Sequence, residues 1–180
     1  MRVISGCARG AVLKTPDGMK TRPTADRVKE ALFSIIQFDI PGAKVLDLFA
    51  GTGQLGIEAL SRGAVSAVFT EEREDACRLI RENLRITKME KVARVIRSDY
   101  LAYLKNTPEK YDIIFLDPPY AEVFLENALK TITEIDILQS GGIIVTERPF
   151  DKEMDLIFQG YSRSKDYKYG KTVLTLYRKA

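Results

Sequence analysis

From residue 43 onward, short apolar runs alternate with stretches whose apolar residues recur at helical spacing, and this alternation limits the folds open to the chain. The apolar runs predict buried strands at residues 45–49, 67–70, 92–96, 113–116 and 143–146. Two intervening stretches, residues 55–61 and 75–87, predict helices. Strands joined through helices form a parallel sheet covered on both faces. The sequence therefore predicts a Rossmann-like α/β fold, in which ligands bind beyond the carboxyl ends of the strands.

The two ends of the chain predict short antiparallel elements. Residues 2–5 and 11–14 predict two strands of a hairpin, and Thr24 is expected to be the N-cap of a helix that ends before residue 41. Residues 161–165 and 173–178 predict a second hairpin that turns at Gly170. We expect one compact unit, in which residues 1–40 extend a ligand-binding domain formed by residues 41–180.

Composition argues against several classes of function. A chain of 180 residues suffices for one domain with its own core, and no apolar run reaches the roughly 20 residues of a membrane span. We expect no signal peptide, and two cysteines without a paired motif favour the reducing cytoplasm. The chain has no histidine, which argues against imidazole catalysis and most zinc sites. We therefore expect a cytoplasmic protein without a resident metal.

Positive charge is concentrated at the amino terminus. Residues 1–29 carry seven basic and two acidic side chains, a balance of +5, which leaves a balance of −2 for the remaining residues. A basic arm beside a slightly acidic body suits a polyanion such as RNA, although a solvated extension is the alternative. The candidate phosphate contacts are Arg9, Lys14, Arg22 and Arg27.

A glycine-rich turn follows the first predicted strand. Gly51, Gly53 and Gly56 have the spacing of a dinucleotide-binding motif, because glycine lets the backbone turn tightly and approach a ligand closely. Glu71 follows at about the 20-residue spacing from which an acid binds ribose hydroxyls. By itself this motif admits a nicotinamide dehydrogenase or a purely structural turn.

Two further acids favour S-adenosylmethionine over a dinucleotide. Asp47 ends the first strand, where a carboxylate suits the ammonium group of a methionine moiety and would repel a pyrophosphate. Asp99 follows the third strand and can accept a hydrogen bond from an adenine amino group, although a helix N-cap is the alternative. The predicted cofactor-binding residues are Asp47, Phe49, Gly51, Thr52, Gly53, Gly56, Glu71 and Asp99.

The sequence Asp-Pro-Pro-Tyr at residues 117–120 follows the apolar strand at residues 113–116. Two consecutive prolines end a strand in a rigid turn. The carboxylate of Asp117 and the carbonyl of Pro118 can then accept both protons of an exocyclic amine, which aims the nitrogen lone pair at a methyl donor. Tyr120 can stack on the base. We therefore predict methyl transfer to a base amine, with Asp117, Pro118 and Tyr120 as the catalytic residues.

With these motifs the chain resembles the bacterial small-subunit ribosomal RNA guanine-N2 methyltransferases, the RsmD family. Elements of the resemblance span residues 9–10, 22–33, 47–56, 58–64, 117–120 and 169–172. The resemblance implies a seven-stranded class I methyltransferase sheet, S-adenosylmethionine as cofactor, and the N2 amine of one guanine in 16S rRNA, within an assembling small ribosomal subunit, as target. Ala11, Val12 and Arg73 depart from the family pattern, and the first two bear on RNA affinity.

Two other functions are open at this point. The Asp-Pro-Pro-Tyr element is shared with adenine-N6 and cytosine-N4 enzymes, so it specifies the chemistry and not the base. A DNA adenine-N6 methyltransferase is therefore an alternative, although so short a chain has no added target-recognition domain. A noncatalytic RNA-binding module is the other alternative. The element at residues 22–28 is more particular to the RNA guanine enzymes.

Overall fold

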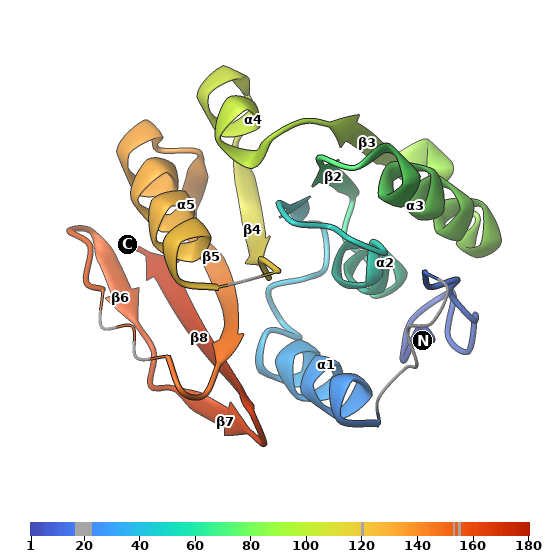
Figure 1. Ribbon diagram of the computed structural model, residues 1–180, viewed down its shortest axis with the longest axis horizontal. Helices are drawn as coiled ribbons and strands as arrows, with labels where there is room; N and C mark the ends of the chain where they lie inside the picture. The colour runs from blue at the N-terminus through green and yellow to red at the C-terminus, as the bar shows by residue number, and fades with distance from the viewer. Residues whose placement is uncertain (17–22, 120, 153, 155) are drawn as a thin grey trace.

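The computed structural model describes residues 1–16, 23–119, 121–152, 154 and 156–180, without the side chains of residues 23–25, 121 and 122. Within these residues, eight strands form one mixed sheet with helices on both faces (Figure 1). The strand order is β3-β2-β1-β4-β5-β8-β6, and β7 also pairs with β8. The predicted α/β class is confirmed.

Apart from β5, which extends the strand predicted at residues 143–146 in both directions, the element bounds agree closely with the predicted ones in the central region. The strands are β1 (Lys44–Asp47), β2 (Ser66–Glu71), β3 (Ala93–Arg97), β4 (Tyr111–Leu116), β5 (Leu138–Pro149), β6 (Tyr161–Arg163), β7 (Tyr167–Tyr169) and β8 (Thr172–Lys179). The helices are α1 (Pro23–Ile35), α2 (Gln54–Ser61), α3 (Glu74–Thr87), α4 (Tyr100–Asn106) and α5 (Ala121–Ile135), with a short 3₁₀ turn η1 (Glu90–Val92).

The sheet reverses its strand order beside β1. Strand β1 pairs in parallel with β2 on one side and with β4 on the other, and β3 and β5 extend the parallel region outward. The chain therefore runs outward from β1 to β3 before it crosses to β4. Adjacent loops diverge at such a reversal and leave a crevice at the carboxyl ends of the strands. The topology thus predicts the position of the site independently of its residues.

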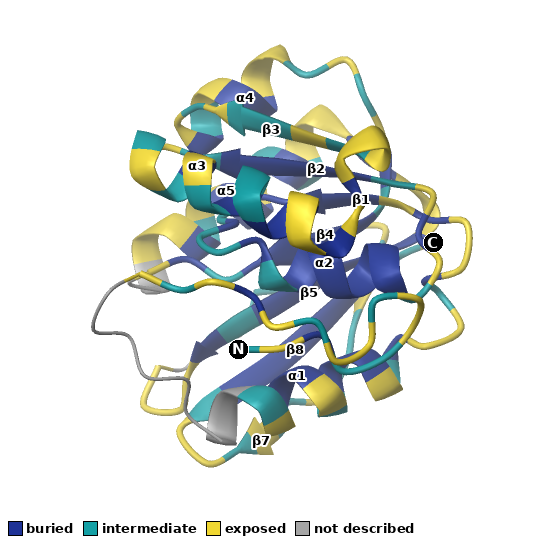
Figure 2. Cartoon of the chain, turned by 90° about the vertical axis from the view of Figure 1, so that its right-hand side faces the viewer, coloured by how far each residue is buried: buried dark blue, intermediate teal, exposed yellow. Residues whose placement is uncertain are grey.

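Two apolar layers enclose the sheet. Under α1, α2 and α3 the core includes Phe33, Ile57 and Phe115, with the rings of Phe33 and Phe115 at 5.7 Å between centroids. Under α4 and α5 the core includes Ile114 and Leu129. Because side chains alternate along a strand, neighbouring residues of β4 serve opposite layers. Figure 2 shows the central strands buried between helices whose outer surfaces are exposed.

The amino-terminal arm, residues 1–14, packs on α2 instead of forming the predicted hairpin strands. A single antiparallel bridge joins Arg2 to Val12. The reason is that two donors of the first segment are used elsewhere: the N–H groups of Ile4 and Ser5 donate to the buried carboxylate of Glu58, at 2.8 and 3.0 Å. The prediction of two hairpin strands was therefore wrong, whereas the close approach of the two segments was right.

Buried contacts lock the arm onto α2. Gly6 has a φ of +87°, and a Cβ there would lie 1.8 Å from the carbonyl oxygen of Ser61, so only glycine fits. Glu58 also accepts a hydrogen bond from Arg62 at 2.8 Å, and the Lys29 ammonium lies 3.7 Å from it. The arm shares the core of the main domain. The boundary predicted at residue 40 stays a prediction.

Two other predicted bounds were wrong. Helix α1 begins at Pro23, so Thr24 lies inside its first turn and not at the N-cap; proline suits the first helical position because it lacks the N–H that would have no partner there. The strand predicted at residues 161–165 is the shorter β6, which ends at Arg163, and the separate strand β7 was not predicted. Both β6 and β7 pair with β8. The predicted turn at Gly170 is present between β7 and β8.

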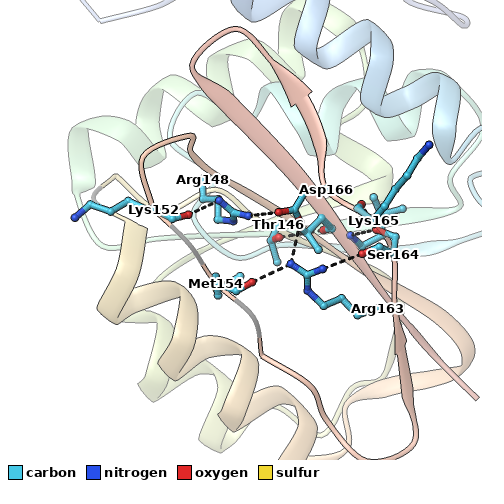
Figure 3. A network of polar contacts seen from close by, with 10 residues as sticks. Thr146, Arg148, Lys152, Met154, Arg163, Ser164, Lys165 and Asp166 are labelled. Atoms are coloured by element: carbon cyan, nitrogen blue, oxygen red, sulfur yellow. Dashed lines mark hydrogen bonds and ion pairs between the residues drawn. The ribbon is translucent and has the colours of Figure 1, made fainter.

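Polar contacts explain the split between β6 and β7. Asp166, between the two strands, accepts hydrogen bonds from Arg148 at 2.6 Å, Arg163 at 2.9 Å and Thr175 at 2.8 Å (Figure 3). The hydroxyl of Ser164 accepts the N–H of Leu176 at 2.9 Å. These side chains take the place of ladder hydrogen bonds and bend the backbone. The strand that begins at Tyr161 therefore stops at Arg163, and the chain pairs with β8 again from Tyr167.

Candidate active site

A cleft of about 1340 Å³ opens at the carboxyl ends of β1, β2, β3 and β4, where the strand order reverses. Its walls also include the turn after β1, one face of α3, Tyr100 at the start of α4, and Phe124 of α5. Residues 12–16 and Met1 of the arm close one side. A volume of this size exceeds that of typical small-molecule sites, so the cleft has room for a cofactor and part of a second substrate.

Most of the predicted site residues meet in this cleft. Those that line it are Asp47, Phe49, Gly51, Thr52, Glu71, Asp99, Asp117, Pro118 and Lys14. Gly53 and Gly56 do not line the cleft. They lie at the N-cap and in the first turn of α2, directly after the residues that do. Tyr120 and Arg22 lie outside the described residues.

The glycine turn after β1 is built from backbone contacts. Gly51 and Gly53 have φ values of +54° and +78°, a conformation that side chains with a Cβ rarely adopt. The N–H of Gly51 donates to Glu71 at 3.1 Å, which joins the turn to the end of β2. At Gly56 a Cβ would lie 2.3 Å from the ring of Phe69, so this glycine permits α2 to pack closely on β2.

Asp47 is a buried carboxyl at the end of β1. One of its oxygens accepts the N–H of Gly56 at 3.0 Å. Burial raises the pKa of Asp47 to about 7, and the negative charges of Asp117 and Glu71 add to this, whereas the Gly56 N–H opposes it. No cation pairs with Asp47 in the described part of the chain. A cationic ligand group would supply the charge that this site lacks.

Two further acids complete the strand-end set. Glu71 accepts the N–H groups of Gly51 and Arg73, at 3.1 and 3.0 Å, and stays half-buried. Asp99 accepts the N–H of Ala102 at 2.9 Å and is the N-cap of α4, so the capping alternative is found. Asp99 also lines the cleft, and its role toward a cofactor stays a prediction.

An aromatic wall stands between these acids and β4. The rings of Phe49 and Tyr100 lie 5.0 Å apart between centroids, and Tyr100 meets Phe124 edge to face at 5.6 Å. The sequence analysis selected Phe49 and missed the other two residues. Tyr100 directly follows Asp99, and Phe124 lies about one helical turn beyond the Asp-Pro-Pro-Tyr element. These positions beside predicted site residues were the sequence signal that could have identified them.

The fourth and fifth strands bring two carboxyls together. Burial raises the pKa of Asp117 to about 6. Glu147, near the end of β5, is half-buried, and burial together with the charge of Asp117 raises its pKa to about 8. The sequence analysis missed Glu147. The signal was an acidic residue directly after the apolar run at residues 143–146.

The predicted RNA contacts have different surroundings. Arg9 and Arg27 are exposed. Lys14 forms an ion pair with Glu82, and its backbone is held by Asn83, which accepts the Lys14 N–H at 2.7 Å. The amide of Asn83 also donates to the carbonyls of Lys14 and Thr52, at 3.0 and 2.9 Å. This residue, also missed, joins the arm to the glycine turn.

The chain is similar in sequence to known methyltransferases over nearly its whole length. A family model described as "Conserved hypothetical protein 95" matches residues 1–178. The chain belongs to this family. It is 38% identical over 182 residues to "Putative rRNA methyltransferase YlbH" of Bacillus subtilis, with 99% of each chain covered. It is 32% identical over 179 residues to "Ribosomal RNA small subunit methyltransferase D" of Escherichia coli, covering 99% of this chain and 90% of the relative. The predicted family resemblance is confirmed.

The fold comparison agrees with the sequence comparison. A solved structure named "Putative methyltransferase yhhF from Escherichia coli" superimposes with a TM-score of 0.90 at 30% identity, covering 99% of this chain and 97% of that one. Among the helices of the described residues, none has the length and apolar character that crossing a bilayer requires. The same residues contain no cluster of three or more metal-ligating side chains.

Proposed function

We propose that this protein transfers a methyl group from S-adenosylmethionine to the exocyclic N2 amine of a guanine in 16S ribosomal RNA, in the cytoplasm and on an assembling small ribosomal subunit. The observation that carries the proposal is one cleft that joins three strand-end acids to Asp117 and Pro118. The names of the relatives in Bacillus subtilis and Escherichia coli support rRNA as the substrate.

The cleft fits S-adenosylmethionine by its charge and shape. Asp47 would hold the ammonium group of the methionine moiety, because its buried carboxyl has no cation among the described residues. Glu71 would bind the ribose hydroxyls, and Asp99 the adenine amine. The rings of Phe49 and Tyr100 offer an apolar wall to the adenine. S-adenosylmethionine supplies a methyl group on a sulfonium centre.

Residues 117–118 act on the amine that receives the methyl group. The carboxylate of Asp117 and the carbonyl of Pro118 accept the two N–H groups, so that the nitrogen lone pair points away from them toward the cofactor. Positive charge grows on the nitrogen as the new N–C bond forms, and the nearby carboxylate stabilises it. The carbon–sulfur bond breaks as the N–C bond forms, so the sulfur would leave as a neutral thioether. The methylated nitrogen then loses one proton to Asp117. A pKa of about 6 leaves Asp117 mostly ionised at neutral pH and able to take that proton briefly.

The amino-terminal arm, together with the start of α1, would bring RNA to the cleft. Arg9 of the arm and Arg27 of α1 are exposed, and Lys14 lines the cleft while its backbone is held by Asn83. Their positive charge suits phosphate groups. The arm also forms one side of the cofactor cleft, so the same segment would border the cofactor and contact the RNA.

The test uses radiolabelled methyl donor and undermodified small subunits, with digestion of the RNA to nucleosides. We expect label in N2-methylguanosine. Asp117→Ala should keep most of its affinity for S-adenosylmethionine and lose nearly all methyl transfer, because the acceptor acts mainly in the transition state. Glu71→Ala should instead weaken cofactor binding by roughly 1–3 kcal/mol. Label in N6-methyl-2′-deoxyadenosine from added DNA would favour the DNA alternative. A protein that transfers no methyl group to any nucleic acid would contradict the proposal.

A further inference from the structure

Glu147 stands beside Asp117 at the edge of the sheet. Leu116 of β4 pairs with Thr146 of β5, so the next residues along the two strands, Asp117 and Glu147, emerge at neighbouring positions. Phe115 and Val145 pack in the same core layer, under α1, α2 and α3. Because side chains alternate, the two carboxyls face that same side. The lining of the cleft ends at residues 117–119, and Glu147 lies one strand beyond it.

Asp117 and Glu147 form a carboxyl pair without a cation. No hydrogen bond or ion pair joins either side chain to another side chain in the described part of the chain. Two carboxyls on neighbouring strand ends in a half-buried place do not both ionise readily. Burial and the charge of Asp117 raise the pKa of Glu147. Asp117 lines the cleft and is the carboxyl nearer the amine on which positive charge grows, so we assign the proton of the pair to Glu147. One carboxyl is thus an acceptor, and the other offers a donor and an acceptor together.

The backbone of β5 holds Glu147 in place. The next residue, Arg148, faces the opposite side of the sheet and binds Asp166 at 2.6 Å and the backbone carbonyl of Lys152 (Figure 3). Glu147 itself pairs with Leu174 in the antiparallel ladder to β8. Its side chain therefore starts from a strand end that is fixed on both sides. A carboxyl that projects from a fixed backbone starts from a constant position, which helps it to distinguish between ligands by hydrogen bonding.

Guanine has a matching edge. Its N2 amine, N1–H and O6 lie in that order along one side of the ring. A neutral carboxyl accepts from N1–H through its carbonyl oxygen and donates to O6 through its hydroxyl. Adenine held by its own N6 amine in the same place turns N1, which has no hydrogen, and C2–H toward the carboxyl, so it can form one hydrogen bond where guanine forms two. Residues 117–120 select an amine but do not select the base, and a second group has to do so.

We propose that Glu147 is the residue that selects guanine, by pairing with its N1–H and O6 while Asp117 holds the N2 amine. This inference rests on the proposed function. It assigns base specificity to the end of β5 and amine chemistry to the end of β4. Glu147 touches the substrate base but takes no part in bond formation, so its removal lowers discrimination between bases and leaves the methyl-transfer step otherwise intact.

The test compares guanine with 2-aminopurine, which keeps the 2-amino group but lacks N1–H and O6. The modified position is first mapped with the wild-type protein. Small-subunit RNA is then prepared with guanosine or 2-aminopurine riboside at that position, and kcat/KM is measured for both. The variants are Glu147→Gln, whose amide keeps one acceptor and one donor, and Glu147→Met, which keeps neither. Glu134→Met, at an exposed position of α5, is the matched control.

We expect the wild-type protein, the control and Glu147→Gln to prefer guanine, by about 10- to 100-fold for one bidentate base contact. Glu147→Met should lose a similar factor on guanine and stay within about threefold of wild type on 2-aminopurine. The 2-aminopurine rate reports whether the variant is folded. If Glu147→Met loses the same factor on both substrates, or keeps the wild-type preference for guanine, the assignment of Glu147 is overturned. Either result would leave the proposed function standing. A wild-type protein that methylates no guanine would overturn the proposed function with it.

Discussion

Replacing Asp47 by asparagine should make the protein more stable at alkaline pH and less able to bind its cofactor. Burial raises the pKa of Asp47 from an ordinary value of 3.8 to about 7. The folded protein therefore keeps this proton over a range in which the unfolded chain releases it, and the free energy of unfolding falls as pH rises from about 4 to about 7. At about 1.36 kcal/mol per pKa unit, the full loss is roughly 4 kcal/mol.

Asparagine removes this loss without removing the hydrogen bond. Its carbonyl oxygen can still accept the N–H of Gly56, which lies 3.0 Å from the Asp47 carboxylate. We expect Asp47→Asn to be about as stable as wild type at pH 4 and roughly 2–4 kcal/mol more stable at pH 8. Affinity for S-adenosylmethionine should fall, because the partner of the ammonium group is gone.

The measurement is urea unfolding of both proteins at several pH values between 4 and 8, with cofactor affinity by calorimetry. Asp151→Asn removes one negative charge at an exposed position and is the control. A stability difference between Asp47→Asn and wild type that does not grow with pH would refute the reasoning. Unchanged cofactor affinity would separately refute the ammonium assignment.

Three other changes test the arm and the glycine turn. Asn83→Asp places a carboxylate oxygen opposite the two backbone carbonyls that the Asn83 amide now binds, so cofactor affinity measured by calorimetry should fall by about tenfold or more. Asn106→Asp, at an exposed position, is the control and should match wild type. Equal affinities of the two variants would show that the arm docks without the Asn83 amide. Gly56→Ala should cost about 1–3 kcal/mol in denaturant unfolding through overlap with a phenylalanine ring, and an unchanged midpoint would contradict this. Replacing Arg9 and Arg27 together by alanine should reduce the salt dependence of RNA binding by about 1.4 in slope, and an unaltered slope would move the RNA contacts elsewhere.

Periodic patterns made the central sheet predictable. Each central parallel strand contains an apolar run, and each acid proposed for the cofactor lies at or just beyond the end of a strand, so spacing alone brought Asp47, Glu71 and Asp99 to one edge. Glycine and proline at residues 51–56 and 118–119 added turns at those ends. Periodicity predicts which residues share a face of the sheet, and strand ends predict where polar side chains gather.

Contacts between distant segments were not predictable in the same way. The arm binds Glu58 across 54 residues and Asn83 across 69 residues, and neither partner carries a local pattern that marks it. The bend at Asp166 likewise depends on Arg148, 18 residues away. Glu147 is an intermediate case, since its position at a strand end was visible but its neighbour Asp117 became apparent only from the pairing of β4 with β5.

The reversal of strand order beside β1 separates, along the chain, the acids proposed for the cofactor from the carboxyls proposed for the target base. The acids proposed for the cofactor all lie between residues 44 and 99, whereas Asp117 and Glu147 lie between residues 111 and 149. Among the described residues of the sheet, the two segments are hydrogen-bonded only where β1 meets β4. A chimera joined between α4 and β4 would take the residues that bind its cofactor from one parent and the residues that contact its target base from the other. The fold therefore offers a natural crossover point for redesigning which base is modified.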